Sequence, residues 1–334
     1  MSALAGADLA GYRAVREAAA LTAAQRWGVI VLRGPDRVRF LHNLISNDVK
    51  GLKAGHSNWS AALALKGKVL AVLRVLSLPE ELWVTLPAEQ KDPILAHLKK
   101  YKIVDKVEFE DRSAAGMRLS LYGAHGAQQL QAAGAALPNL APGQHAAASL
   151  AGAQVEIDRS QDVTGAPGYD LYVAKDSAAA VRDALEAAGA ASLTDAALDV
   201  LRIEAGWPVY GIDVSDDNFP GEVELERAVS YTKGCFLGQE TVARIRSRGH
   251  VNRLLRGLRF EADQLPAAGA AALADGKEVG RVTSACHSPQ YGAIALALLH
   301  RSAADPGAQI EIRADDQPLI ASIQPLPFQP SDRA

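Results

Sequence analysis

The chain of 334 residues contains only two cysteines, Cys235 and Cys286. Two thiols cannot build a disulfide framework, which indicates a reducing compartment. No apolar run approaches the roughly 18 residues that a membrane-spanning helix needs. The N-terminal segment also lacks the basic start and apolar stretch of a signal peptide. The sequence therefore predicts a cytoplasmic protein that makes no membrane contact.

An excess of charge of either sign is also missing, because the formal net charge is −3. A chain without a global basic excess is not drawn to nucleic acid as a whole, which argues against direct nucleic-acid binding. The usual nucleotide-binding and hydrolase motifs, G-x-G-x-x-G, the phosphate-binding loop and G-x-S-x-G, do not occur. The single Cys286-His287 pair gives too few ligands for zinc, and no CxxC or HxxxH spacing supplements it. We therefore predict no metal site.

The length exceeds one ordinary core, so two or three domains are expected. In the first third, strands and helices alternate without a strict βαβ repeat, which predicts an α+β class with antiparallel sheets. A Lys66-Gly67 turn joins the two arms of a hairpin, and Asp36 is a candidate helix N-cap. The elements expected here are strands at 27–33, 59–65, 69–78, 82–87 and 101–109, and helices at 37–44 and 90–100.

The pattern changes along the rest of the chain. Residues 134–152 are rich in Ala, Gly and Pro and predict a loop, whereas short strands follow one another at a spacing near ten residues from about Leu254. That spacing predicts a small β-barrel or sandwich at the C-terminus. Between these regions we expect strands at 117–122 and 169–175 and helices at 124–133, 177–188, 194–205 and 240–248.

The most specific stretch is Lys-Gly-Cys-Phe-Leu-Gly-Gln-Glu at residues 233–240. Lys233 precedes the Cys235 thiol by two positions, and a helix is expected to start at Glu240. A helix start and a nearby ammonium both lower the pKa of a thiol, which favours a reactive thiolate. The alternative is a buried cysteine beside a glycine turn.

Three further features are candidates for ligand binding. Glu222 lies in an acidic loop, and a carboxylate in a cleft can accept two parallel hydrogen bonds from a pterin or guanine. Trp27 starts a strand, where an aromatic is either core or a stacking face for a flat heterocycle. The arginines between 244 and 259, Arg244 and Arg246 among them, form a solvated helix face or bind a polyanion such as a folate glutamate tail or RNA phosphates.

Three segments together resemble the folate-binding aminomethyltransferase (GcvT) superfamily. They are RIEAGWPVYGID at 202–213 with Pro220-x-Glu222, the 233–240 segment, and VGRVTS from Val279 with a later Ser-Pro and IALA. The sequence KGCFLGQETVAR is similar to the YgfZ branch, the iron–sulfur-assembly relatives. The resemblance implies three domains in a ring around a channel that binds tetrahydrofolate or a one-carbon derivative.

The family resemblance also implies domain limits and site residues. The folate-binding domain would comprise residues 1–50 and 114–248, interrupted by a ferredoxin-like domain at 51–113 and followed by a barrel domain at 249–334. Cys235 and Lys233 would carry catalysis. The cofactor would be held by Trp27, Glu222, Gln239, Glu240, Arg244 and Arg246.

Three functional hypotheses follow from these observations. The first is a tetrahydrofolate-binding accessory factor that supports iron–sulfur enzymes, such as the radical enzymes that thiolate tRNA. The second is an aminomethyltransferase of the glycine cleavage type. Those enzymes carry acids after the hairpin glycine, whereas Gly67 is followed here by KVLAVLRVLS, which counts against the second hypothesis. The third is a non-catalytic module that binds RNA or protein.

Overall fold

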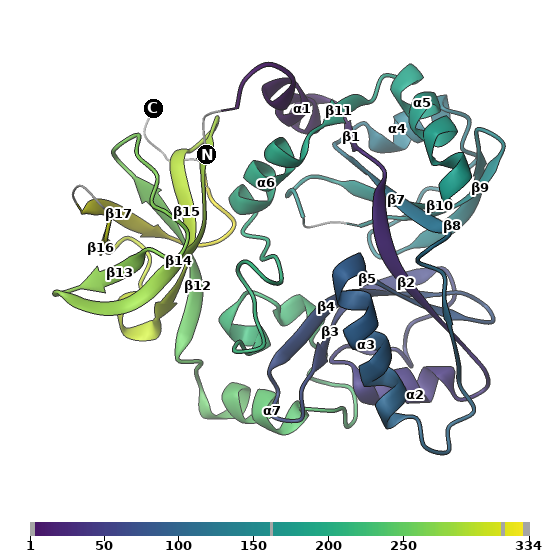
Figure 1. Cartoon of the computed structure of the whole chain (residues 1–334), viewed down its shortest axis with the longest axis horizontal. Helices are drawn as coiled ribbons and strands as arrows, with labels where there is room; N and C mark the ends of the chain where they lie inside the picture. Colours follow the sequence, from purple (N-terminus) through teal and green to yellow (C-terminus); the bar gives the residue numbers. More distant parts are fainter. Residues whose placement is uncertain (1–3, 161–162, 315–317, 330–334) are drawn as a thin grey trace.

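The computed structural model describes residues 4–160, 163–314 and 318–329, and it confirms the predicted α+β class with a C-terminal barrel. Its strands form one curled sheet of eleven strands and one closed barrel of six. Figure 1 shows the two halves of the sheet and the barrel grouped around a common centre. The helices lie on the outer side of the sheet halves or between the sheet and the barrel.

The first half of the sheet has the strand order β3-β4-β5-β2, with β6 added along β2. Alternating apolar residues place Ile30 and Leu32 of β2 against Leu41 of α2 and Ile94 and Leu98 of α3, all of them buried. The bounds are β2 (Gln25–Arg33), α2 (Arg37–Leu44), β3 (His56–Leu63), β4 (Val69–Ser77), β5 (Leu82–Pro87), α3 (Ala88–Tyr101) and β6 (Glu108–Asp111).

The second half continues as β7-β10-β9-β8, with β1 and β11 at the side of β7. Its core lies between the strands and α5, where Leu119, Ile157, Leu171, Val181 and Leu185 are buried. The bounds are β1 (Ala20–Thr22), β7 (Gly116–Tyr122), α4 (Gly126–Ala132), β8 (His145–Leu150), β9 (Ala153–Asp158), β10 (Gly168–Ala174), η1 (Lys175–Ser177), α5 (Ala178–Ala187) and β11 (Ala191–Leu193).

Strand β2 belongs to both halves of the sheet. Gln25 and Arg26 pair with β7, whereas residues from Trp27 to Leu32 pair with β5. Trp27 is therefore the first residue after the strand leaves one half for the other.

The C-terminal strands close into a barrel in the order β12-β15-β14-β13-β16-β17. Its interior is filled by small and branched apolar side chains, including Leu258, Ala295, Ile310, Ile312 and Ile323. The bounds are β12 (Arg253–Phe260), β13 (Ala271–Ala274), β14 (Lys277–Ser288), β15 (Gly292–His300), η4 (Arg301–Ala303), β16 (Gln309–Ile312) and β17 (Leu319–Gln324). The short helices η2 (Pro220–Glu222) and η3 (Glu226–Ala228) and helix α7 (Gln239–Arg248) connect the sheet to the barrel.

Helices α1 (Gly6–Glu17) and α6 (Asp195–Glu204) lie between the second half of the sheet and the barrel. Thr194 caps α6 by accepting a hydrogen bond from the Ala197 N–H. At the other end, the buried Glu204 carboxylate accepts hydrogen bonds from the Tyr12 hydroxyl at 2.9 Å and from Ser288 Oγ of the barrel at 2.5 Å, and it pairs with Arg16. One carboxylate thus joins α1, α6 and the barrel.

A second buried junction begins two residues earlier on α6. Arg202 donates to Asp213 Oδ2 at 2.6 Å, and their side chains are 5% and 0% exposed. Asp213 also accepts from Thr283 Oγ1 at 2.5 Å and Ser284 Oγ at 2.7 Å, both on β14, and from the Val209 N–H at 3.0 Å. Buried charges are tolerated when every acceptor is satisfied, which this arrangement achieves.

Three local predictions were wrong. The alternating residues 101–109 are not one strand, because α3 extends to Tyr101 and the next apolar residues, Ile103 and Val104, are 85% and 84% exposed in a loop. The predicted loop 134–152 contains β8, whose alanines hid the alternation that pairs it with β9. Asp36 makes no side-chain cap on α2, because its carboxylate accepts from the Lys106 N–H instead.

The limits of the three domains stay a prediction. Strand β2 lies between the strands of the 51–113 segment and those of the 114–248 segment and joins them into one sheet. The 249–334 segment contains every strand of the barrel.

Replacing Asp213 with alanine should lower the free energy of unfolding by about 3–5 kcal/mol, because Arg202 would stay buried without its partner. Urea denaturation followed by circular dichroism measures this loss. Asp183→Ala, which removes the partner of the exposed Arg182, is the matched control and should leave the urea midpoint unchanged. Equal midpoints for the two variants would contradict a structural role for the pair.

Candidate functional site

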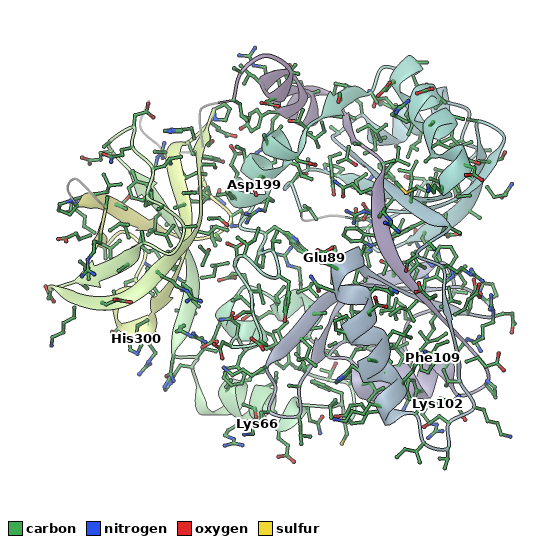
Figure 2. The ribbon with its side chains drawn as sticks, viewed as in Figure 1. Lys66, Glu89, Lys102, Phe109, Asp199 and His300 are labelled. Atoms are coloured by element: carbon green, nitrogen blue, oxygen red, sulfur yellow. The ribbon has the colours of Figure 1, made fainter. Side chains whose placement is uncertain are left out.

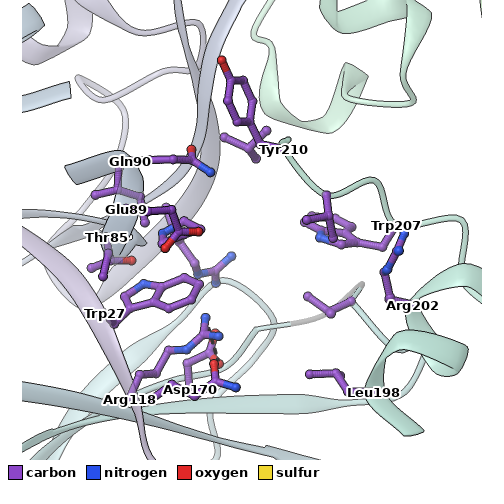
Figure 3. A pocket seen from close by; sticks show the side chains of 18 of the residues that line it. Trp27, Thr85, Glu89, Gln90, Arg118, Asp170, Leu198, Arg202, Trp207 and Tyr210 are labelled. Carbon is purple, nitrogen blue, oxygen red and sulfur yellow. Dashed lines mark ion pairs between the residues drawn. The ribbon is translucent and has the colours of Figure 1, made fainter. Parts of the chain in front are cut away.

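A cavity of about 460 Å³ lies where the two halves of the sheet meet α6 and the loop that follows it. Its lining comes from β2, β3, β4, β5, α3, β7, β10 and α6, so residues far apart in the sequence share one space. We call it the central pocket, and Figure 3 shows it from close by. Its size lies within the range that small-molecule ligands occupy.

Aromatic side chains form two facing walls of the central pocket. On one side, the Arg118 guanidinium lies on the Trp27 ring, with Cζ 3.3 Å from the ring centroid. On the other side, Trp207 packs against Trp59, with ring centroids 4.9 Å apart. Figure 3 shows open space between Trp27 and Trp207. Aromatic walls of this kind suit a flat, heteroaromatic ligand.

The backbone explains how Trp207 reaches the pocket. Helix α6 ends at Gly206, which has φ +65°, and the Trp207 N–H closes the helix end on the Arg202 carbonyl at 2.8 Å. A Cβ at position 206 would lie 2.7 Å from Leu326 Cβ, so a side chain there has no room. The glycine therefore turns the chain and lets Trp207 enter the pocket wall.

Three polar atoms of lining residues are shielded from solvent and have no hydrogen-bond partner in the part of the chain that the structure describes. They are the indole nitrogens Nε1 of Trp27 and Trp59 and the amide oxygen Oε1 of Gln90. Buried polar groups are normally paired. These two donors and one acceptor therefore fit a ligand that carries both acceptors and donors at its edge.

Two of the arginines in the pocket are fully engaged. Arg74 pairs with the buried Asp158 and also donates to Ser57 Oγ at 2.8 Å. Arg202 is held by Asp199 and Asp213. These contacts fix the two side chains as parts of the scaffold.

Asp170 of β10 is a buried carboxylate in the pocket lining, 2% exposed. Its Oδ1 accepts from Ser120 Oγ at 2.5 Å and lies 3.8 Å from Arg118. Burial, with a smaller contribution from Asp170, raises the pKa of Tyr122 to about 12 and raises the pKa of Tyr172 further. Both phenols are therefore neutral at physiological pH, and Asp170 is the acidic side chain at the pocket floor.

Strand β4, which follows Gly67 in the sequence, brings no carboxylate to the central pocket. The residues that it contributes to the lining are Val72 and Arg74. Carboxylates reach the pocket from other elements instead, namely from Asp170, from Asp195 and Asp199 of α6, and from Glu89 of α3. Figure 2 labels Glu89 and Asp199, which approach the centre of the molecule from different sides.

Of the predicted cofactor residues, Trp27 lines the central pocket and Glu222 does not. Glu222 is 3% exposed, and its two oxygens accept from Arg253 Nε at 3.2 Å and Arg253 Nη2 at 3.0 Å. It also accepts from the Phe219 N–H at 3.0 Å. The structure thus uses this carboxylate to join η2 to β12.

The other predicted cofactor residues lie on α7, outside the central pocket. Glu240 and Arg244 are exposed, and Arg246 stacks on Tyr231 with Cζ 3.9 Å from the ring centroid. Gln239 Oε1 accepts from the Phe236 N–H at 3.2 Å and so closes the turn before the helix. These residues stay predictions for folate binding, since they are not brought together with Trp27.

The 233–240 segment is shaped by contact with the β3–β4 hairpin. Gly238 has φ +82°, and a Cβ there would lie 2.5 Å from the Ala64 carbonyl oxygen and 3.1 Å from Gly67 Cα. Gly67 has the same φ and faces Gly238 in return. The two glycines let backbone pack on backbone, which explains why the segment needs a glycine at 238. Cys235 itself is exposed.

Lys233 holds the C-terminal end of α2. Its Nζ donates to the carbonyl oxygens of His42 at 2.5 Å, Ile45 at 2.7 Å and Asn47 at 2.7 Å. Burial lowers the pKa of Lys233 to about 7, whereas three carbonyl partners favour the protonated form. We take the ammonium as the form present, because only an ammonium has three N–H donors.

Most of the pocket lining was not predicted from the sequence. The unpredicted residues include Trp59, Arg118, Asp170 and Asp199. Trp207 stood in a recognised motif but was not assigned to the site. The only local signal was its place directly after the helix-ending Gly206. The other residues come from strands and helices whose proximity depends on the sheet order.

Two findings bear on other classes of site. Within residues 4–160, 163–314 and 318–329, no group of three or more His, Cys, Asp or Glu side chains could hold a metal ion. In the same ranges, no helix has the length and apolar character required to cross a membrane.

Comparison with known proteins gives the following relationships. Residues 5–233 match the GCVT N-terminal domain, and residues 253–329 match the glycine cleavage T-protein C-terminal barrel domain. The aminomethyltransferase of Geobacillus kaustophilus is 32% identical over 326 residues, which cover 95% of this chain and 89% of that protein. An aminomethyltransferase of Thermus thermophilus is 33% identical over 325 residues, with coverage of 95% and 89%.

A solved structure shows the same likeness. The glycine cleavage system aminomethyltransferase T from Bartonella henselae superimposes with a TM-score of 0.87 at 25% sequence identity. The match covers 96% of this chain and 89% of that one.

These relatives contradict the hypothesis of an accessory factor for iron–sulfur enzymes and tRNA modification, because proteins named aminomethyltransferase match nearly the whole chain. They support the superfamily but neither its YgfZ-type branch nor iron–sulfur client enzymes as partners. The lack of an acid after Gly67 does not count against the aminomethyltransferase hypothesis, because the fold brings carboxylates to the pocket from other strands and helices.

Lys233→Met should lower the free energy of unfolding by about 1–3 kcal/mol, because three carbonyl groups lose their donor. It should change the rate at which iodoacetamide alkylates the exposed Cys235 by less than about twofold, since the ammonium is bonded to α2. Urea denaturation and mass spectrometry measure the two quantities. Lys66→Met, at an exposed hairpin residue, is the control. A tenfold slower alkylation would instead support Lys233 as the activator of the thiol.

Proposed function

Because the chain belongs to the glycine cleavage T-protein family, we propose that it is a tetrahydrofolate-dependent aminomethyltransferase and that folate binds in the central pocket. The observation that carries the proposal is the pair of facing aromatic walls, Arg118–Trp27 on one side and Trp207–Trp59 on the other. The reduced pterin of tetrahydrofolate is a small, nearly flat heterocycle that fits between such walls.

The polar atoms of the lining also fit a pterin. Its amino-pyrimidinone edge carries both hydrogen-bond donors and acceptors, and the unpartnered atoms of Trp27, Trp59 and Gln90 supply two donors and one acceptor. The cavity of about 460 Å³ is large enough for the ring system.

Bound tetrahydrofolate would supply the nitrogens that take up the one-carbon unit. In an aminomethyl transfer, two folate nitrogens would form bonds to the methylene carbon while its bonds to the amine nitrogen and to the lipoyl sulfur break. The two protons lost by the folate nitrogens would end on the ammonia and the lipoyl thiol that leave. The chain must therefore orient a nitrogen and help a proton reach the leaving amine. We assign this work to Asp170, since it is the buried carboxylate at the pocket floor and has one oxygen held by Ser120.

The exposed thiol is not part of this proposal. Cys235 lies outside the central pocket lining, so its catalytic role stays a prediction. Placement in the YgfZ-type branch rests mainly on KGCFLGQETVAR at residues 233–244 and stays a prediction as well, as does a location in the cytoplasm.

Calorimetric titration with tetrahydrofolate under argon tests the binding site. Trp27→Ala should weaken the affinity by about 10- to 100-fold, because one aromatic wall is removed. Trp83→Ala is the matched control, since Trp83 belongs to the same apolar cluster but does not line the central pocket. Folded wild-type protein that binds no tetrahydrofolate would reject the proposal.

Ammonia release from an aminomethyl-lipoyl carrier, measured with and without tetrahydrofolate, tests the reaction. Asp170→Asn should lower kcat by about 100-fold or more while tetrahydrofolate affinity stays within about threefold, because the side chain keeps its shape and loses its charge. Asp183→Asn on α5 serves as the control for the loss of one carboxylate. Folate binding without any ammonia release by the wild type would retain the binding site and eliminate the transferase.

A further inference from the structure

Arg118 differs from the buried arginines around it. Its side chain is 13% exposed and lines the central pocket. Its nearest carboxylate oxygen, Asp170 Oδ1, lies 3.8 Å from Nη1, beyond hydrogen-bond distance. Among the residues that the structure describes, its guanidinium donates no hydrogen bond, and it lies near Asp170 and on the Trp27 ring. Its N–H donors are therefore free, whereas those of Arg74 and Arg202 are taken.

The position of this guanidinium is nevertheless fixed. Arg118 lies in the middle of the β7–β10 ladder, where it faces Tyr172, and it also pairs with Gln25 of β2. Stacking on Trp27 at 3.3 Å then holds the planar group against the pocket wall. A charged fork that is held in place with its donors unused is suited to bind a carboxylate through two parallel hydrogen bonds.

We propose that Arg118 is the carboxylate-binding residue of the central pocket. The assignment rests on the proposed function for the identity of the ligand and adds the chemistry of one of its groups. The carboxylate has two possible sources. One is the glutamate tail of the folate itself, and the other is a separate amino acid that meets the folate in the pocket. Asp170 does not compete for this role, because its Oδ1 accepts from Ser120 and stays 3.8 Å away.

The two sources are separated by titrating three probes under argon. Tetrahydrofolate carries the glutamate, 6-methyltetrahydropterin keeps the pterin ring and carries no carboxylate, and glycine added to the tetrahydrofolate complex is the separate carboxylate. Each probe is titrated into wild type, Arg118→Gln, Arg118→Lys and the exposed-arginine control Arg182→Gln. Near-identical circular dichroism spectra and urea midpoints establish that the variants are folded.

If the glutamate tail is the source, Arg118→Gln weakens tetrahydrofolate binding about 10- to 100-fold and leaves 6-methyltetrahydropterin binding unchanged. If a separate carboxylate is the source, both pterin compounds bind normally and glycine binding is lost. Arg118→Lys retains part of the affinity in either case, because it keeps the charge and loses the fork.

Two results overturn the assignment. Equal losses for tetrahydrofolate and 6-methyltetrahydropterin would show that Arg118 acts only by supporting Trp27. No change with any of the three probes would show that it binds no carboxylate. Failure of the wild type to bind tetrahydrofolate would instead reject the proposed function, and glycine titrated into the free wild type and Arg118→Gln would then decide the role of Arg118 by itself.

Discussion

The buried ion pair between Arg202 and Asp213 is the constraint on which the shape of the site depends. It joins the last turn of α6 to strand β14 of the barrel, and the same aspartate accepts from the Val209 backbone. The segment between its two residues contains Gly206 and Trp207, so the pair closes a short loop over the pocket. Since every acceptor on Asp213 is used, the charge is compensated and the loop has one position.

Helix 37–44 could be predicted from the sequence, whereas the place of Asp170 in the pocket could not. Helix and strand patterns depend on neighbours a few residues apart, which is why α2, β5 and the β3–β4 hairpin were found almost to the residue. The barrel was found because its strands recur at short intervals. Asp170, Arg118 and Trp27 come together only because β10, β7 and β2 are neighbours in the sheet, and no local pattern encodes that order.

The 233–240 segment shows how much of a specific motif packing can account for. Its lysine caps α2, its second glycine accommodates the hairpin, and its glutamine closes a turn. Three of the residues that make the segment distinctive are thus explained by packing. The exposed Cys235 is the residue that packing leaves unexplained. A motif that is rare in sequence therefore identifies a structural junction here, whereas the candidate chemistry lies in residues with no motif at all.

Strand β2 has a consequence for how such a chain could be assembled in evolution. This single strand pairs with β7 at one end and with β5 along the rest. Either half of the sheet alone would therefore be left with an unpaired strand edge. The two halves therefore depend on each other as one structural unit. The barrel is different, since one contiguous stretch supplies all six of its strands and closes on itself. It is the part that recombination could exchange as a module, provided that the new barrel supplied hydroxyl partners for Asp213 and Glu204.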